Sequence, residues 1–476
     1  MNRSMIRYLL AKLLLIEAAL LIVPIIVALI YGEPLKIFLS IGATMAILLV
    51  LGGIGSYFKP KDLHIYAKEG VLIVALCWIL WSFFGALPFV FSGQIPDVID
   101  AFFEISSGFT TTGATILNDV NVLSHSLLFW RSFTHLIGGM GVLVFALAIM
   151  DNAKNGHLEV MKAEVPGPVF GKVVSKLKST AQILYIIYLA LFAIFALLYF
   201  LAGMPLFDSL VIAMGTAGTG GFTVYNDGIA HYNSSLITYL VSFGVLAFGV
   251  NFNLYYYLLI RKFKACFEDE ELKGYLWIVF LSTAFNVFHL YQGFAKSVEI
   301  SFFQVANVIT TTGFGYGDTV KWPLFSQVIL LLLMCIGGSA GSTAGGFKVI
   351  RGIIISRIAK NQILSTLSPN RVLTLHVNGA VIDKDTQHKV LKYLAVYILI
   401  VLTLIFIVSL DNDNFMTVVS GVLSCFNNIG PMIGTTDTFS IFSPFSKLLL
   451  AFAMIGGRLE IYPILLLFLP KTWSRR

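Results

Sequence analysis

The chain has 476 residues, of which 57% are hydrophobic and only 12% charged, and its mean hydropathy is +0.86. A soluble domain of average composition carries about 25% charged residues, so these values exclude an ordinary soluble protein. They predict an all-α polytopic membrane protein, because lipid offers no water to unpaired backbone groups. The formal net charge of +7 does not by itself indicate a nucleic-acid partner.

The basic residues are grouped between apolar stretches. Residues 93–130 and 203–260 contain no Lys or Arg. The clusters lie near the N-terminus and at Lys59–Lys68, Lys154–Lys178, Arg261–Lys273, Lys348–Lys392 and Lys471–Arg476. This positive-inside pattern predicts that both termini are cytoplasmic, and it accounts for the basic charge without nucleic-acid binding.

Two apolar spans open the chain, at about 5–31 and 36–57, and residues 1–58 form the predicted N-terminal pair of transmembrane helices. The first span runs on to Tyr31 without a small-residue cleavage site, so it is not expected to be a signal peptide. The four cysteines are scattered and form no CxxC pair. Neither a disulfide framework nor a zinc site is therefore predicted.

The rest of the chain repeats one unit four times: a long apolar helix, a short half-apolar helix, a Gly/Thr-rich break and a return helix. The predicted repeats are 59–150, 151–262, 263–360 and 361–476. Long or return helices are expected at 67–92, 126–150, 178–203 and 234–260, and short helices at 97–109, 299–309 and 413–426. The breaks read TTTGAT, TAGTGGFT, TTTGFGYGD and NNIGPMIG, and the glycines aligned between them are Gly113, Gly220, Gly313 and Gly430.

Each short helix is too short to cross a bilayer and is expected to be re-entrant. Non-helical backbone at membrane depth is tolerated only where protein buries it or where it lines a water-filled path. The breaks fall in segments poor in Lys and Arg, hence on the outer side. Acidic residues such as Asp119 and Asp318 lie in the same segments; either they concentrate cations at a mouth or they simply face solvent.

Four equivalent breaks can meet around one axis, where backbone carbonyls replace the hydration shell of a cation. Glycine allows the required backbone angles, and threonine adds an uncharged oxygen ligand. The C-terminal ends of the short helices, which are partially negative, also favour a cation there. One such loop alone would indicate only a turn, but four at the same place predict an ion filter.

At this point the motifs resemble known proteins. TTGFGYGD is similar to the potassium-channel filter signature TVGYGD. ISSGFTTTGAT, TAGTGGFT, GGSAGSTAGGFKVIR and IGGRLEIYPI together resemble the TrkH/KtrB family of bacterial potassium transporters over nearly the whole chain. The two leading spans are typical of the TrkH branch. The resemblance implies four membrane–pore–membrane repeats with one potassium pore per chain, in a homodimer within the lipid of the bacterial inner membrane. It also implies a cytosolic TrkA-type nucleotide-binding regulatory ring.

Carried over by motif, the resemblance implies a potassium filter built from four segments. Its residues are Thr111, Thr112, Gly113 and Ala114; Thr219, Gly220 and Gly221; Thr311, Thr312, Gly313, Phe314 and Gly315; and Asn428, Ile429, Gly430 and Pro431. The fourth segment has no Thr before its glycine. This departure implies fewer well-formed ion sites and less strict selectivity.

A second interruption lies between about Trp322 and Ala359, an apolar run too long for one straight span. In its middle is GGSAGSTAGG, residues 337–346. Small residues can form a packing stripe, but an unbroken run of them favours a loop. In the family this loop gates the pore, which assigns gating to Gly337, Gly338, Gly341, Gly345 and Gly346.

Arg458 lies inside the last apolar span, with Glu460 nearby. A buried charge in a membrane helix is expensive and indicates function. Arg458 is expected either to hydrogen-bond the 337–346 loop and act as a positive barrier, or to form a structural ion pair with Glu460 or Glu104. A structural, hydrogen-bonded role is expected for Glu104, packing for His135, and hydrogen bonds between helices for Asn251 and Asn253.

The predicted function is potassium uptake through a gated pore. The alternative is a sodium- or proton-coupled potassium symporter on the same fold, although the four repeats share one orientation, unlike the inverted repeats of many secondary transporters. An enzyme is not expected, because HExxH is absent and the GxSxG match at Ser339 lacks the strand that a nucleophile elbow needs. The absence of GxxxxGK[ST] places any nucleotide sensing in a partner.

Overall fold

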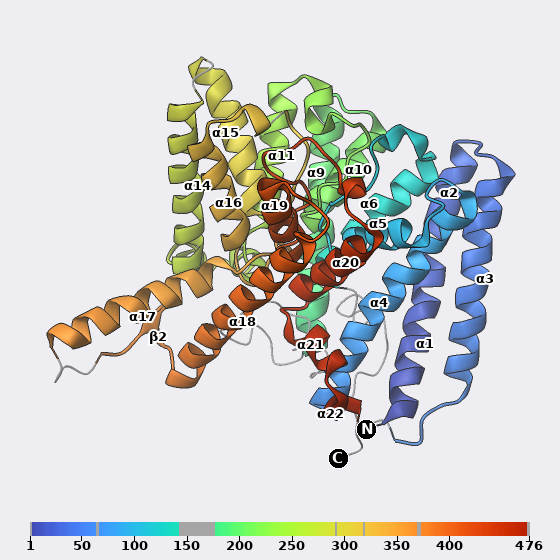
Figure 1. Cartoon of the computed structure of the whole chain (residues 1–476), viewed down its shortest axis with the longest axis horizontal. Coiled ribbons are helices and arrows are strands. Elements are labelled where there is room, and N and C mark those ends of the chain that lie inside the picture. Colours follow the sequence, from blue (N-terminus) through green and yellow to red (C-terminus); the bar gives the residue numbers. More distant parts are fainter. Residues whose placement is uncertain are drawn as a thin grey trace.

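The computed structural model describes residues 2–62, 66–141, 177–290, 293–317, 319–368 and 373–473. Figure 1 shows a bundle of helices in which the two termini lie at the same end. By length and composition, five described helices can cross a membrane, or six if one bent pair forms a single span. The described secondary structure is helical apart from one two-stranded hairpin, β1 (His376–Val377) and β2 (Ala380–Val381). The prediction of an all-α polytopic membrane protein is confirmed.

The N-terminal unit is a helical hairpin made of α1 (Arg3–Leu20), α2 (Ile22–Ile30) and α3 (Leu35–Tyr57). The predicted first span is interrupted at Leu21, because Pro24 has no N–H to donate to the carbonyl of Leu20. Helices α1 and α3 pack closely, since an added Cβ on Gly55 would lie 2.6 Å from the Cβ of Ala11.

The first repeat begins as predicted and ends differently. It contains α4 (Ala67–Ser92), α5 (Val98–Phe109), the 3-10 turn η1 (Val120–Val122) and α6 (His125–Gly139). The return helix expected at 126–150 ends at Gly139, and residues 142–150 lie outside the described part of the chain. Gly138 explains a close helix crossing, because any Cβ there would overlap the carbonyl oxygen of Phe109.

The second repeat corrects another prediction. It contains α9 (Leu177–Leu201), α10 (Leu206–Gly218), η2 (Gly228–Tyr232), α11 (Ser235–Phe248), α12 (Phe252–Leu259) and the short α13 (Phe263–Phe267). The return helix expected at 234–260 is two helices bent by 90°. Asn251 caps α12 by accepting a hydrogen bond from the N–H of Asn253. For Asn251, whose side chain caps its own helix, the expected hydrogen bond between helices is replaced by this local one.

The third and fourth repeats follow the same plan. The third contains α14 (Glu270–His289), α15 (Phe294–Ile309), η3 (Thr319–Lys321), α16 (Leu324–Ile336) and α17 (Val349–Leu367). The fourth contains α18 (Lys384–Val408), α19 (Phe415–Phe426), η4 (Phe439–Ile441), α20 (Pro444–Arg458), α21 (Tyr462–Phe468) and α22 (Pro470–Trp473). The predicted break after α16 is present, whereas the final span, expected to continue through Arg458, is broken there.

Burial follows the pattern of a membrane protein. The largest buried cluster joins the N-terminal hairpin to the first and fourth repeats and includes Trp78, Trp81 and Trp130. The outer face of α14 instead exposes large apolar side chains, with Phe280 at 62% and Phe288 at 82%. Exposed aromatic rings of this kind would be costly in water and are favourable against lipid.

Candidate ion pathway

The four breaks begin with the same backbone turn. Helices α5, α10, α15 and α19 each end just before a residue in the left-handed region, with φ of 57° at Thr111, 56° at Thr219, 55° at Thr311 and 58° at Asn428. Glycine is the usual residue at this position of a helix C-terminus. Non-glycine residues there carry strain, which is concentrated at functional sites. The repetition shows that the four breaks are equivalent in conformation.

Hydrogen bonds give the register between the breaks. The residue after each left-handed one donates its N–H to the carbonyl five residues earlier: Thr112 to Ser107 at 2.8 Å, Gly220 to Gly215 at 2.8 Å, Thr312 to Asn307 at 2.9 Å and Ile429 to Ser424 at 2.9 Å. Gly220 is therefore equivalent to Thr112. The glycine equivalent to Gly113, Gly313 and Gly430 is Gly221, so the alignment on Gly220 is wrong by one residue.

The four segments form a closed ring. An added Cβ on Gly113 would overlap the backbone of Gly221, and one on Gly221 would overlap Gly313. A Cβ on Gly313 would overlap the carbonyl oxygen of Ile429. The ring closes because a Cβ on Gly430 would lie 2.9 Å from the carbonyl carbon of Gly113. Backbone therefore meets backbone at all four junctions, and at each of them at least one residue is a glycine, which has no side chain to prevent the approach.

Each of the four breaks forms one corner of the ring, and the first corner, after α5, is supported by a buried ion pair. Glu104 accepts hydrogen bonds from the hydroxyl of Thr115 at 2.9 Å and from the N–H of Ile116 at 2.9 Å. The Nε of Arg131 donates to Glu104 at 2.6 Å, and the guanidinium lies 3.4 Å from the centre of the Phe222 ring. The structural role expected of Glu104 agrees with these contacts. Arg131 was missed, although a lone Arg inside a predicted apolar span is a recognisable signal.

Side chains also support the other corners. The side chain of Asn307 bonds both the N–H and the carbonyl of Phe314, each at 2.8 Å. The Nδ2 of Asn428 donates to the hydroxyl of Thr112 at 3.0 Å, linking the fourth corner to the first. At the second corner, the ring of His135 stacks on Phe222 with centroids 4.3 Å apart. His135 is thus a packing residue, as predicted.

The 337–346 loop between α16 and α17 lies directly against the ring. The N–H of Gly345 donates to the hydroxyl of Thr311 at 2.6 Å, and a Cβ on Gly345 would overlap the carbonyl oxygen of Asn427. Gly337 and Gly346 pack backbone to backbone, and both have positive φ. They bring the two ends of the loop together.

The other loop residues contact the bend between α11 and α12. The N–H of Ser339 donates to the carbonyl of Gly249 at 3.0 Å, and the hydroxyl of Thr343 donates to the carbonyl of Phe248 at 3.1 Å. Gly341 accepts from the N–H of Phe252 at 3.0 Å. These bonds satisfy backbone groups that the broken helix leaves open. Gly338 packs against the same bend, because a Cβ added to it would lie 3.2 Å from the carbonyl oxygen of Gly249.

Arg458, at the end of α20, connects three repeats. Its Nη1 donates to the carbonyl of Thr343 at 2.7 Å, and its Nη2 donates to the carbonyls of Gly138 at 2.6 Å and Gly139 at 2.5 Å. The hydrogen bond expected between Arg458 and the loop is present. The two carboxylates considered as alternative partners are bonded elsewhere: Glu104 pairs with Arg131 at 2.6 Å and Glu460 with Arg351 at 2.5 Å.

A second buried acid, Glu271 on α14, also fixes the loop. Its Oε1 accepts hydrogen bonds from the N–H of Ala340 at 2.7 Å and of Ile350 at 3.1 Å. The buried Lys348 donates its Nζ to the carbonyl of Ala344. Neither role was predicted, because Glu271 precedes an apolar span where a solvated acid is equally common.

The acidic residues near the outer loops have partners of their own. The amide of Asn226 donates to Asp119 at 2.8 Å and holds the pKa of this exposed carboxyl below its usual value. The hydroxyl of Tyr232 donates to Asp208 at 3.0 Å. Asp318 lies outside the described residues. Both interpretations of these acidic residues, a rim that concentrates cations and simple exposure to solvent, stay predictions.

Replacing Glu104 with Gln is expected to destabilise the protein by about 3–5 kcal/mol, because it leaves the Arg131 charge buried without its carboxylate. The midpoint of thermal unfolding in detergent measures this effect. Asp385→Asn is the matched control, because it breaks the exposed pair with Lys389 and should cost less than about 1 kcal/mol. Equal midpoints for the two variants would contradict the assigned role of Glu104.

Three comparisons bear on this geometry. The family model TrkH, described as "Cation transport protein", matches residues 40–276 and 271–475. The chain is 33% identical to the Trk system potassium uptake protein TrkH of Salmonella typhimurium over 97% of each chain. It is also 33% identical to the Trk system potassium uptake protein TrkG of Escherichia coli K12 over 94% of each. The crystal structure of the potassium transporter TrkH from Vibrio parahaemolyticus superposes with a TM-score of 0.89, covering 100% of both chains at 28% identity.

Proposed function

Because the chain belongs to the TrkH family of cation transport proteins, we propose that it takes up potassium through a single pore at the ring of four breaks. One observation carries the proposal: the closed backbone ring that joins Gly113, Gly221, Gly313 and Gly430. A ring of backbone carbonyls can replace the hydration shell of potassium. A protein named as a potassium uptake protein is 33% identical to this chain over 97% of its length.

The proposed filter uses the residues just before and at these glycines. They are Thr111, Thr112, Gly113, Thr219, Gly220, Gly221, Thr311, Thr312, Gly313, Asn428, Ile429 and Gly430. Four short helices end at the ring, and their partially negative C-termini favour a cation there. The amide of Asn428 bonds Thr112 at a corner where the other repeats have threonine. We expect this asymmetry to leave fewer equivalent ion sites and to relax selectivity.

The proposed gate is the loop of residues 337–346, with Gly337, Gly338, Gly341, Gly345 and Gly346 as its flexible points. The bond from Gly345 to Thr311 supports a position immediately next to the filter. Arg458 bonds the same loop at Thr343 and brings a positive charge close to the cation path. The only apolar side chains of the loop are Ala340 and Ala344, so few buried apolar contacts oppose its movement, and the hydrogen bonds described above hold it in place.

The proposed setting is the bacterial inner membrane with both termini in the cytoplasm, following the basic clusters. Figure 1 supports this orientation, since both termini lie at one end of the bundle and α17 extends away from it near that end. We propose a homodimer with a cytosolic TrkA-type nucleotide-binding subunit docked on this side. Segments 151–177 and 357–390 are its proposed docking sites; residues 151–176 lie outside the described part.

Flux through the purified protein in liposomes tests the proposal. With a potassium gradient alone, downhill flux is expected, and it should exceed sodium flux under the same conditions, because a pore needs no driving ion. Empty liposomes are the control. Potassium moving uphill only when a sodium or proton gradient is imposed would instead establish the coupled symporter, and equal potassium and sodium fluxes would contradict the filter.

A further inference from the structure

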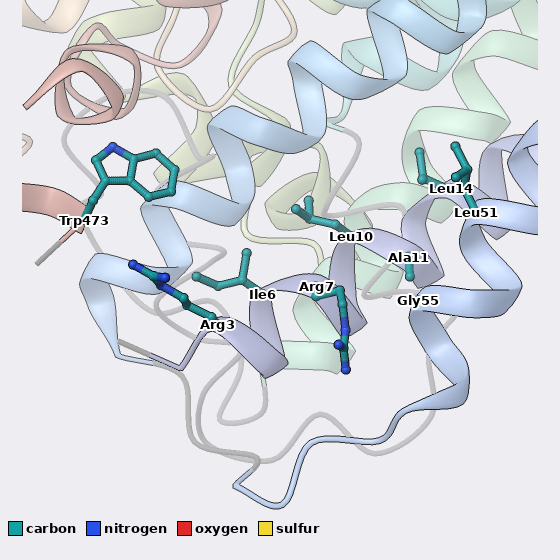
Figure 2. A pocket seen from close by; sticks show the side chains of 9 residues that line it. All are labelled: Arg3, Ile6, Arg7, Leu10, Ala11, Leu14, Leu51, Gly55 and Trp473. Atoms are coloured by element: carbon teal, nitrogen blue, oxygen red, sulfur yellow. The ribbon is translucent and has the colours of Figure 1, made fainter. Parts of the chain in front are cut away.

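A pocket of about 610 Å³ lies between the N-terminal hairpin and the C-terminus, away from the ring. Figure 2 shows its lining side chains, which come from α1, α3 and α22. Arg3 and Arg7 lie toward the end of α1 that is nearest the chain termini, and Trp473 lies on the side of Arg3. Neither the proposed filter nor the proposed gate contributes a residue to this pocket.

The pocket is amphipathic along its length. Arg3, Arg7, Leu10 and Leu14 follow one another on a single stripe of α1, because residues three or four apart share a helix face. At a rise of 1.5 Å per residue, the stripe is roughly 16 Å long, charged at one end and apolar at the other. Leu51 of α3 faces the apolar end.

The arginines are available to an anion. Both side chains are exposed. Arg7 donates one Nη2 hydrogen bond to the carbonyl of Phe58 at 3.1 Å, which leaves the rest of its guanidinium free to donate. Within the described residues, neither arginine pairs with a carboxylate. The nearby acid Glu69 is buried and already accepts hydrogen bonds from the N–H groups of Asn2 and Tyr66.

We propose that this pocket binds an anionic phospholipid. Its phosphate would lie at Arg3 and Arg7 and one acyl chain along Leu10, Leu14 and Leu51. The guanidinium group suits phosphate because its donors form a rigid fork. Basic pockets beside membrane helices attract anionic headgroups, and Trp473 provides the aromatic residue typical of the membrane–water interface. The site itself does not depend on the proposed function, but its assignment to the cytoplasmic leaflet rests on the proposed orientation with cytoplasmic termini.

The binding affinity for phosphatidylglycerol, titrated into the purified detergent-solubilised protein and followed by native mass spectrometry, tests the charged end. Arg3→Gln combined with Arg7→Gln should weaken binding at least fivefold, the change that corresponds to about 1 kcal/mol for a single basic residue near an anionic headgroup. Lys59→Gln combined with Lys61→Gln is the matched control, with the same charge change outside the pocket. Equal losses in both double variants would overturn the proposal.

A second variant tests the apolar end. Leu51→Trp should fill the space for the acyl chain and weaken phosphatidylglycerol binding while both arginines stay in place. Phosphatidylcholine should bind less tightly than phosphatidylglycerol to the unchanged protein. Undiminished binding to Leu51→Trp, or inorganic phosphate competing at the same concentration as the lipid, would show only an anion site and overturn the proposal. Potassium flux is not the readout, so failure here is separable from failure of the pore proposal.

Discussion

Replacing Gly313 with alanine is expected to lower the ratio of potassium to sodium flux at least tenfold, a change equivalent to about 1.4 kcal/mol. Gly313 has φ of +75°, where alanine is strained by roughly 1–2 kcal/mol, and its added Cβ would overlap the carbonyl oxygen of Ile429. Either the Gly313 backbone or that carbonyl must move. Both belong to the proposed ion ring, so the spacing of ion ligands changes at two corners.

Gly317→Ala provides the matched control for this prediction. Gly317 also has positive φ, at +68°, but an added Cβ would meet nothing within 4 Å. It therefore carries the same kind of backbone strain without the overlap, and its flux ratio should stay close to that of the unchanged protein. Liposome flux and size-exclusion elution should be measured for both variants. A folded Gly313→Ala protein that keeps its potassium preference would refute the filter assignment.

Replacing Arg458 with alanine is expected to raise potassium flux about tenfold or more. The guanidinium bonds the loop at Thr343 and the end of α6 at Gly138 and Gly139. Hydrogen bonds to charged groups contribute roughly 1.5–3 kcal/mol each, so their loss favours loop conformations that leave the path open. The same change removes a positive charge that repels the permeating cation.

Two further variants separate these effects. Arg458→Lys retains the charge but cannot reach three carbonyls in a fork, so an intermediate flux is expected if the hydrogen bonds hold the gate. Lys447→Ala is the control on the same helix: Lys447 is buried and pairs with Asp100 at 2.7 Å, away from the loop. Its flux should not rise. Unchanged or lower flux in folded Arg458→Ala protein would exclude the gating role.

Much of the architecture follows from local pattern. The helix expected at 67–92 is α4, Ala67–Ser92, and the one at 97–109 differs from α5 by a single residue. The family is confirmed, and since it is a family of cation transport proteins, so is the prediction that the chain is not an enzyme. Ser339 lies in the loop between helices α16 and α17, without the strand required by its GxSxG match. The repeat boundaries, filter and gate stay predictions.

Two of the errors share one cause, which is that the deciding contacts come from distant segments. TAGTGGFT contains two adjacent glycines, and nothing local distinguishes them; the bond from Gly220 to Gly215 and the contact with Gly313 select Gly221. The residues at the bend between α11 and α12 were expected to be helical. They unwind where the 337–346 loop satisfies the carbonyls of Phe248 and Gly249.

The sequence by itself determined the membrane class, the four repeats, the positions of the breaks and the unusual charge at Arg458. These properties depend on hydrophobic length, glycine content and charge, which are local quantities. Only the tertiary structure decided which glycines meet, which carboxylate pairs with which arginine, and what Arg458 holds. Buried charges and open backbone groups are satisfied by whichever partner the fold brings within hydrogen-bond distance, and that partner can lie hundreds of residues away, as Thr112 does from Asn428.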